Sequence, residues 1–168
     1  MRCDMKTWSN TAYLTAKAYK RMLSLRRLKA LGASTSQLLD VLDKQVLPVL
    51  WLGAPAWFCM LTQQERQDFD RVAKVGLRII YGDKYCGFEN TLKVANMLRP
   101  TMQMSRMTAK FAVKSSKHPK FSKWFKPATQ KTVNTRSSKN TPVFASVPSR
   151  TARYKKSPIP HMTQLLNA

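Results

Sequence analysis

The sequence predicts a mainly α protein: an irregular helical bundle of about five helices, followed by a basic, partly disordered C-terminal tail. Apolar residues recur with helical spacing through most of the first 117 positions, and the 168 residues include only five glycines. The tail is predicted because residues 127–157 are rich in Ser, Thr, Pro, Lys and Arg but poor in large apolar side chains. We therefore expect a helical domain over 1–126, a basic linker or tail over 127–157, and a short docking segment over 158–168.

The first predicted helix covers residues 7–31 and ends before Gly32, a residue suited to a helix C-terminus. Its apolar face is Leu14, Ala18, Met22, Leu25 and Leu28. A capping box, Ser34 with Gln37, opens a second helix that Pro48 kinks or ends. The apolar run over 46–61 contains prolines and is shorter than the roughly 20 residues of a membrane span, so we expect it to be buried core.

A second capping box, Thr62 with Glu65, opens the most regular helix, which ends at Gly82. Its apolar face includes Gly76, which is less favourable than Ala in a helix by about 1 kcal/mol. A glycine retained there indicates close contact with another helix.

The C-terminal half begins with a short predicted helix over 88–98, and Pro100 is well placed to open the next. In that helix, Met104, Met107 and Phe111 are expected to point to one side. Residues 158–160 (PIP) are expected to be stiff and extended, and residues 161–167 to form one or two helical turns that dock through Met162, Leu165 and Leu166.

Net charge is the most unusual property of the sequence, at +22 from 30 Lys/Arg and 8 Asp/Glu. All eight acidic residues lie in the first 89 positions, whereas residues 90–168 contain 16 Lys/Arg and no acid. A surface of one sign calls for a polyanionic partner, with nucleic acid the first candidate and an anionic membrane surface the second. For residues 127–157, a basic tail without any specific role is an equally good interpretation.

Basic residues recur with helical spacing in three predicted helices and form three basic faces: Lys17, Lys20 and Arg27; Arg71, Lys74 and Arg78; and Arg106, Lys110, Lys114 and Lys117. A single such face is usually only solvated. Three together favour a track for phosphates, which predicts nucleic-acid binding.

An aromatic and basic segment, HPKFSKWF, covers residues 118–125. Lys120, Lys123 and Trp124 complete the set of candidate nucleic-acid-binding residues. The aromatic residues there either stack on bases beside phosphate contacts or anchor the tail to the core, and the sequence favours anchoring modestly.

Signatures of catalysis are missing from the sequence. It has no glycine-rich phosphate loop, no HExxH and no GxSxG, so we expect no enzyme activity of this chain and no cofactor. Asp40 and Asp43 could share a cation in principle, but a solvated helix face is the better interpretation, and we expect no metal site. Cys3, Cys59 and Cys86 form neither a disulfide framework nor a zinc pattern, which fits an intracellular protein of the nucleus or cytoplasm.

An ordered series of short segments resembles the region after the polymerase core in non-LTR (LINE-like) retroelement reverse transcriptases. The segments of the first half are 8–11 (WSNT), 17–21 (KAYKR), 25–32 (LRRLKALG), 45–50 (QVLPVL), 54–57 (APAW), 61–62 (LT), 65–66 (ER), 70–72 (DRV) and 77–82 (LRIIYG). Those of the second half are 110–111 (KF), 117–121 (KHPKF), 124–125 (WF), 157–160 (SPIP), Thr163 and 165–167 (LLN).

The resemblance implies a helical thumb with its C-terminal extension, which packs on the palm domain of the parent polymerase and holds an RNA–DNA template–primer duplex by its backbone. The family's catalytic aspartates lie upstream and are not present, so the implied role is non-catalytic, sequence-independent binding of RNA or DNA. Two alternatives remain: an inactive retroelement remnant, or a small basic adaptor protein. A membrane partner is not expected.

Overall fold

The computed structural model describes residues 7–128 and 143–167, without the side chains of residues 7–9. The chain is mainly α-helical, as the sequence predicts, and Pro127 and Phe144 form an isolated antiparallel bridge. It divides into two compact units: unit 1 combines Met1–Ala54 with Leu61–Met104, and unit 2 combines Pro55–Met60 with Ser105–Ala168. The predicted boundaries at 126 and 157 both fall inside unit 2.

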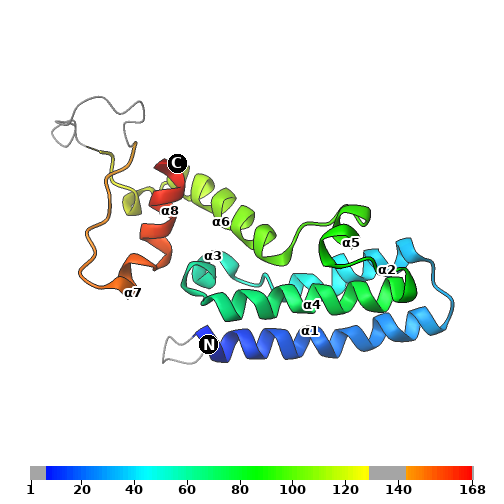
Figure 1. Cartoon of the computed structure of the whole chain (residues 1–168). Helices are drawn as coiled ribbons and strands as arrows, with labels where there is room; N and C mark the ends of the chain where they lie inside the picture. The colour runs from blue at the N-terminus through cyan, green and yellow to red at the C-terminus, as the bar shows by residue number, and fades with distance from the viewer. Residues whose placement is uncertain (1–6, 129–142, 168) are drawn as a thin grey trace. The chain divides into compact units, whose positions relative to one another are not determined.

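Unit 1 is a set of helices around two long ones that run side by side (Figure 1). In chain order these are α1 (Thr7–Ala30), α2 (Thr35–Val41), the π-helical turn η1 (Leu42–Val46), the 3₁₀ turn η2 (Leu47–Val49), α4 (Gln63–Tyr81), the 3₁₀ turn η4 (Gly82–Lys84) and α5 (Phe88–Val94). Helix α1 packs against α4, α2, η1 and η2, and α4 also packs against α2 and α5.

Helix α1 buries most of the face that its spacing predicts, although Leu28 is only partly buried. Leu14, Ala18, Met22 and Leu25 are each at most 3% exposed. Gly32, at φ +83°, ends the helix as predicted. Its N–H donates to the carbonyl of Lys29, and the next N–H, of Ala33, donates to the carbonyl of Leu28. This pair of bonds is a Schellman motif, in which a left-handed residue closes the last helical turn.

Both predicted capping boxes are confirmed. In each, the N-cap hydroxyl accepts a hydrogen bond from the N–H three residues later, and that residue's side chain accepts from the N-cap N–H. The residues are Ser34 with Gln37 at the start of α2, and Thr62 with Glu65 at the start of α4. Glu65 also accepts a hydrogen bond from the Thr11 hydroxyl at 3.1 Å, which ties α4 to α1.

The second helix changes type before Pro48. Its α-helical part ends at Val41, η1 follows, and Pro48 lies in η2. Proline lacks an N–H and so cannot continue an α-helical ladder. The apolar run over 46–61 is mostly buried, as predicted, although Leu52 is 70% exposed.

Gly76 makes the close helix contact that the sequence predicts. A Cβ at this position would lie 2.5 Å from Cδ1 of Leu42 in η1. Both residues are buried, so α4 and η1 approach each other at a point where one of them has no side chain.

Helix α5 ends at Val94, four residues before its predicted end, so that prediction is wrong. Asn96 takes the left-handed conformation with φ 51°. Its N–H donates to Lys93, and the Met97 N–H donates to Leu92, which gives a second Schellman motif. Asparagine is the residue after glycine that most readily adopts this conformation.

Unit 2 contains most of α6 (Pro100–Lys117), which begins at Pro100 as predicted. Its other elements are most of α3 (Ala54–Trp57), then η3 (Phe58–Met60), η5 (Ser122–Trp124), α7 (Ala152–Lys155) and α8 (Pro158–Asn167). Its core joins α6, the end of η5 and α8: Ala112, Phe125 and Met162 are buried, with Phe144 and Leu166 packed against them.

The predicted apolar face of α6 is confirmed only at Met104, which is fully buried. Phe111 is 38% exposed and Met107 only partly buried, whereas Thr108, Ala112 and Ser115 are each at most 2% exposed. Small side chains let a helix come close to its neighbours, and a hydroxyl can be buried when it is hydrogen-bonded. Hydrophobicity alone therefore predicts a face that is displaced around the helix from the one that is buried.

The end of the chain is more helical than predicted. Residues 158–160 form the first turn of α8 instead of an extended segment, since proline is well tolerated there. Within the predicted tail, the Phe144 N–H donates to Oδ1 of Asn167 and the Asn167 amide donates to the Phe144 carbonyl. The described residues of the predicted tail also contain helix α7, and only residues 129–142 of it lie outside the described residues.

Candidate nucleic-acid interface

The basic face of α1 consists of Lys17, Lys20 and Arg27. Lys20 and Arg27 are exposed. Lys17 is partly buried, and its ammonium lies 5.7 Å from the centre of the Tyr13 ring, which is a cation–π distance. Two cations of this face are therefore exposed, and the third lies against an aromatic ring.

Two other cations of α1 stabilise unit 1 through hydrogen bonds to backbone carbonyls, and the sequence alone does not single them out. Arg21 donates to the carbonyl of Gln45 at 2.7 Å, and Lys29 donates to the carbonyl of Ile79 at 2.5 Å. Ile79 lies in the last turn of α4, where carbonyls lack helical partners and a cation is favourable. The partners are 24 and 50 positions away, so no local pattern could have revealed them.

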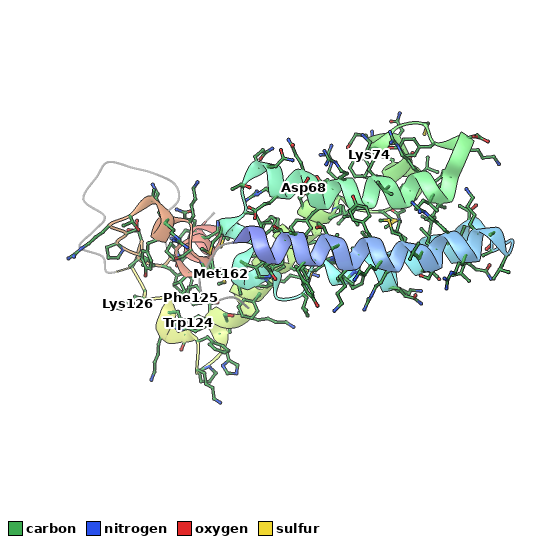
Figure 2. All side chains as sticks on the ribbon, turned by 90° about the horizontal axis from the view of Figure 1, so that it is seen from below. Asp68, Lys74, Trp124, Phe125, Lys126 and Met162 are labelled. Atoms are coloured by element: carbon green, nitrogen blue, oxygen red, sulfur yellow. The ribbon has the colours of Figure 1, made fainter. Side chains whose placement is uncertain are left out.

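The basic face of α4 consists of Arg71, Lys74 and Arg78, and two of the three have partners. Arg71 forms an ion pair with Asp68 at 3.6 Å, and the guanidinium of Arg78 lies 5.3 Å from the centre of the Tyr85 ring. Lys74 is partly buried (Figure 2). The face exists as predicted, but part of its charge is compensated.

Tyr19 on α1 lies close enough to the Arg71–Asp68 pair to sense both charges. Burial raises the pKa of the Tyr19 hydroxyl above its usual value; the Arg71 charge opposes this shift and the Asp68 charge adds to it.

The basic face of α6 has a simpler environment. Its four cations, all exposed, are Arg106, Lys110, Lys114 and Lys117. At 100° per residue, they lie on the side of the helix opposite to the buried Thr108, Ala112 and Ser115. The sequence of unit 2 contains no Asp or Glu, so these cations have no carboxylate side chain of their own unit to pair with.

The aromatic residues of the segment over 118–125 lie in two different environments. Phe125 is 4% exposed and lies in the core of unit 2 with Met162, whereas Trp124 is 40% exposed (Figure 2). Lys120 and Lys123 are exposed. The anchoring interpretation therefore describes Phe125, and Trp124 is left at the surface beside the two lysines.

Asp70 of α4 has a structural role. Oδ1 of Asp70 accepts hydrogen bonds from the Thr101 N–H at 3.3 Å and from its hydroxyl at 3.1 Å, which caps the first turn of α6. Burial raises the pKa of Asp70 even though Thr101 and Arg99 favour its charged form. Arg99 is itself paired with Glu89.

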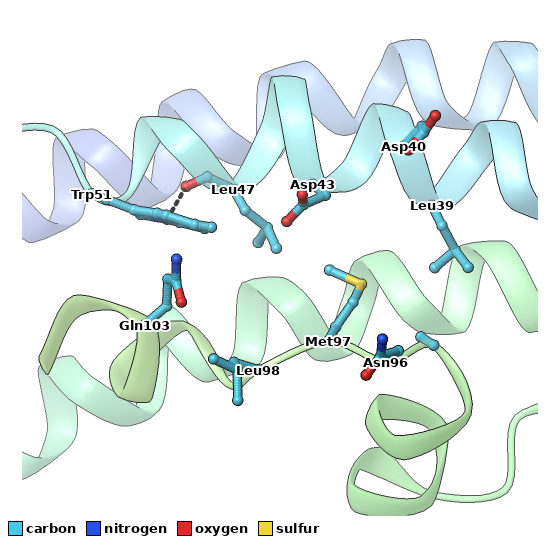
Figure 3. Close-up of a pocket in the computed structure, with 10 residues that line it drawn as sticks. Leu39, Asp40, Asp43, Leu47, Trp51, Asn96, Met97, Leu98 and Gln103 are labelled. Carbon is cyan, nitrogen blue, oxygen red and sulfur yellow. Dashed lines mark hydrogen bonds between the residues drawn. The ribbon is translucent and has the colours of Figure 1, made fainter. Parts of the chain in front are cut away.

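A hollow of about 310 Å³ in unit 1 lies between η1 and the segment that follows α5 (Figure 3). Apolar side chains line it together with Asp40, Asp43, Asn96 and Gln103, and none of the ten lining residues is basic. Asp40 is paired with Lys44 at 3.0 Å, which supports a solvated helix face. An anion such as phosphate would find no cation among these lining residues.

Within residues 7–128 and 143–167, no group of three or more His, Cys, Asp or Glu side chains could hold a metal ion. None of the described helices has the length and apolar character that a membrane span requires. Comparisons of the chain with protein-family models, with curated proteins and with solved structures found no match. Whether the thirteen candidate residues contact nucleic acid stays a prediction.

Proposed function

We propose that this chain binds the backbone of RNA or DNA without sequence specificity, as a non-catalytic, thumb-like C-terminal piece of a non-LTR retroelement reverse transcriptase. The observation that carries the proposal is the basic face of α6. Four exposed cations follow about 16 Å of helix, since each residue adds 1.5 Å. Cations aligned on one helix face neutralise phosphates and release counterions, which drives binding that ignores base sequence.

The faces of α1 and α4 add to this binding, the face of α4 to a smaller extent. Lys20 and Arg27 are exposed, but Arg71 already has a carboxylate partner. A phosphate must displace that partner before it gains the Arg71 cation, so this contact is weaker.

The parent protein would supply the polymerase chemistry through its palm domain, and an RNA–DNA template–primer duplex would be the natural ligand. This part of the proposal depends on the segments that resemble the family. It assigns the chain itself no polymerase activity, and it places the protein in the nucleus or the cytoplasm.

The test is a titration of one duplex against the whole chain at several salt concentrations. If about five to eight phosphates are contacted, log K should fall with log salt with a slope of about −4 to −7. Replacing Arg106, Lys110 and Lys114 by Gln should flatten that slope by about two to three, because each lost contact removes nearly one.

The matched control replaces Arg26, Lys84 and Lys93, three exposed cations outside the basic faces, by Gln. It removes the same charge and should change the slope by less than one. Equal effects of the two triple variants would show that only net charge matters. No binding by the parent chain would favour the inactive remnant, and binding to anionic vesicles alone would favour the adaptor.

A further inference from the structure

Three aromatic rings form a row on the surface of unit 2. The ring centres of His118 and Phe121 are 5.0 Å apart, and those of Phe121 and Trp124 are 4.8 Å apart. The backbone explains the row: the Phe121 N–H donates to the His118 carbonyl and the Trp124 N–H to the Phe121 carbonyl. Bonds between residues three apart make side chains at that spacing nearly eclipse one another.

A lysine precedes each ring in the sequence. Lys117, Lys120 and Lys123 repeat with the same spacing of three as the rings, and all three are exposed. The segment thus repeats a pair, a cation followed by an aromatic residue, three times. Such alternation places lysines and aromatic residues together on one short stretch of the chain.

The Trp124 ring, at one end of this row, is not part of the core of unit 2. Phe125 is 4% exposed and anchors the segment against Ala112 and Met162, whereas Trp124 is 40% exposed. His118, at the other end of the row, is also exposed, and its Nδ1 accepts a hydrogen bond from the Lys120 N–H at 3.2 Å, which orients the ring.

We propose that this row is a stacking site for single-stranded nucleic acid, with an unpaired base on Trp124 and phosphates on Lys120 and Lys123. The inference rests on the proposed nucleic-acid binding and adds a ligand class to it. Bases in a duplex already stack on their neighbours, so an exposed tryptophan gains a base only from an unpaired strand. The α6 face, in contrast, needs only a phosphate backbone.

The experiment compares a short oligothymidine with a blunt duplex of the same length by fluorescence anisotropy. Two variants of the whole chain separate stacking from packing: Trp124→Leu keeps apolar bulk without a π-face, and Trp124→Phe keeps a π-face. Trp124→Leu should weaken single-strand binding about 5- to 100-fold. It should change duplex binding less than twofold, and Trp124→Phe should stay close to the parent protein.

The matched control is Tyr154→Leu, at an aromatic residue of the same unit that is 44% exposed and lies between Arg153 and Lys155. It should leave single-strand binding within twofold. Parent-like single-strand binding by Trp124→Leu, with duplex binding intact, would overturn the stacking site and leave the proposed function standing. Absence of binding to either oligonucleotide by the parent protein would overturn the proposed function itself.

Discussion

Unit 1 and unit 2 carry nearly the same number of basic residues but use them differently. Unit 1 has 16 Lys/Arg and all eight acidic residues, whereas unit 2 has 14 Lys/Arg and no acidic residue. In unit 1, Arg21 and Lys29 hold backbone carbonyls, and Lys44, Arg71 and Arg99 have carboxylate partners. Several cations of unit 1 are therefore engaged in contacts within the fold.

Net charge alone therefore overstates how much of a surface is available to a polyanion. The described cations of unit 2 are exposed, and the sequence of that unit contains no carboxylate side chain to compensate them. Mutual repulsion of these cations destabilises unit 2, and a bound polyanion would relieve it. Binding should therefore depend mainly on unit 2, and stability mainly on the contacts of unit 1.

The largest expected effect on stability concerns the packing of unit 1. Replacing Gly76 by Leu should lower the free energy of unfolding by about 1–3 kcal/mol, because overpacking a buried contact forces its neighbours to move. A Cβ alone would already come within 2.5 Å of Leu42 Cδ1. Urea melts measure the change, and nucleic-acid affinity of the folded variant should stay at the parent level. An unchanged melt would show that α4 and η1 are not packed closely at this point.

The sequence predicts the local features of this fold well. The capping boxes at Ser34 and Thr62, and the helix end at Gly32, depend on residues within three or four positions of each other. The end of α5 at Val94 could also be predicted from the sequence, because Asn96 is suited to the left-handed conformation that ends a helix. The apolar residues beyond it led to a longer predicted helix instead.

Features that depend on tertiary packing could not be predicted. The buried side of α6 is set by where small side chains such as Ala112 meet Phe125 and Met162, and hydrophobic spacing pointed to Phe111. For the candidate interface, helical spacing predicts basic faces. It cannot tell an exposed cation from one such as Lys29, whose carbonyl partner is 50 positions away.

Single lysines of the two units should therefore respond in opposite ways. Lys29→Met should lower the free energy of unfolding by about 1 kcal/mol, because the last turn of α4 loses a charged donor to the Ile79 carbonyl. Lys120→Met, at an exposed position of unit 2, should change stability by less than about 0.5 kcal/mol.

Binding should show the reverse order. Lys120→Met should flatten the salt dependence of single-strand binding by about 0.7 of a unit of slope, and Lys29→Met should leave it unchanged. Thermal or urea melts and salt titrations of the two variants provide the comparison. If Lys29→Met loses binding and keeps stability, the division between the two units is wrong.

The smallest effect concerns Asp70, whose carboxylate caps α6 within unit 1. Its pKa is raised because burial disfavours the charged form, so the folded chain holds the Asp70 proton more tightly than the unfolded chain does. Asp70 therefore makes a contribution to stability that declines as pH rises from about 4, the ordinary pKa of Asp, through its raised pKa, and then levels off.

The variant Asp70→Asn keeps an oxygen that can accept hydrogen bonds from Thr101, but its side chain cannot ionise. The variant should match the parent protein in acid and become the more stable of the two as pH rises through this window. Urea melts of both proteins across the window measure the difference, and an NMR titration of the Asp70 carboxyl carbon gives its pKa directly.

A variant that loses stability relative to the parent as pH rises would mean that the hydrogen bonds of Thr101 and the charge of Arg99 outweigh the effect of burial on the Asp70 pKa. The carboxylate would then stabilise unit 1 by its charge, as the paired acids of that unit do.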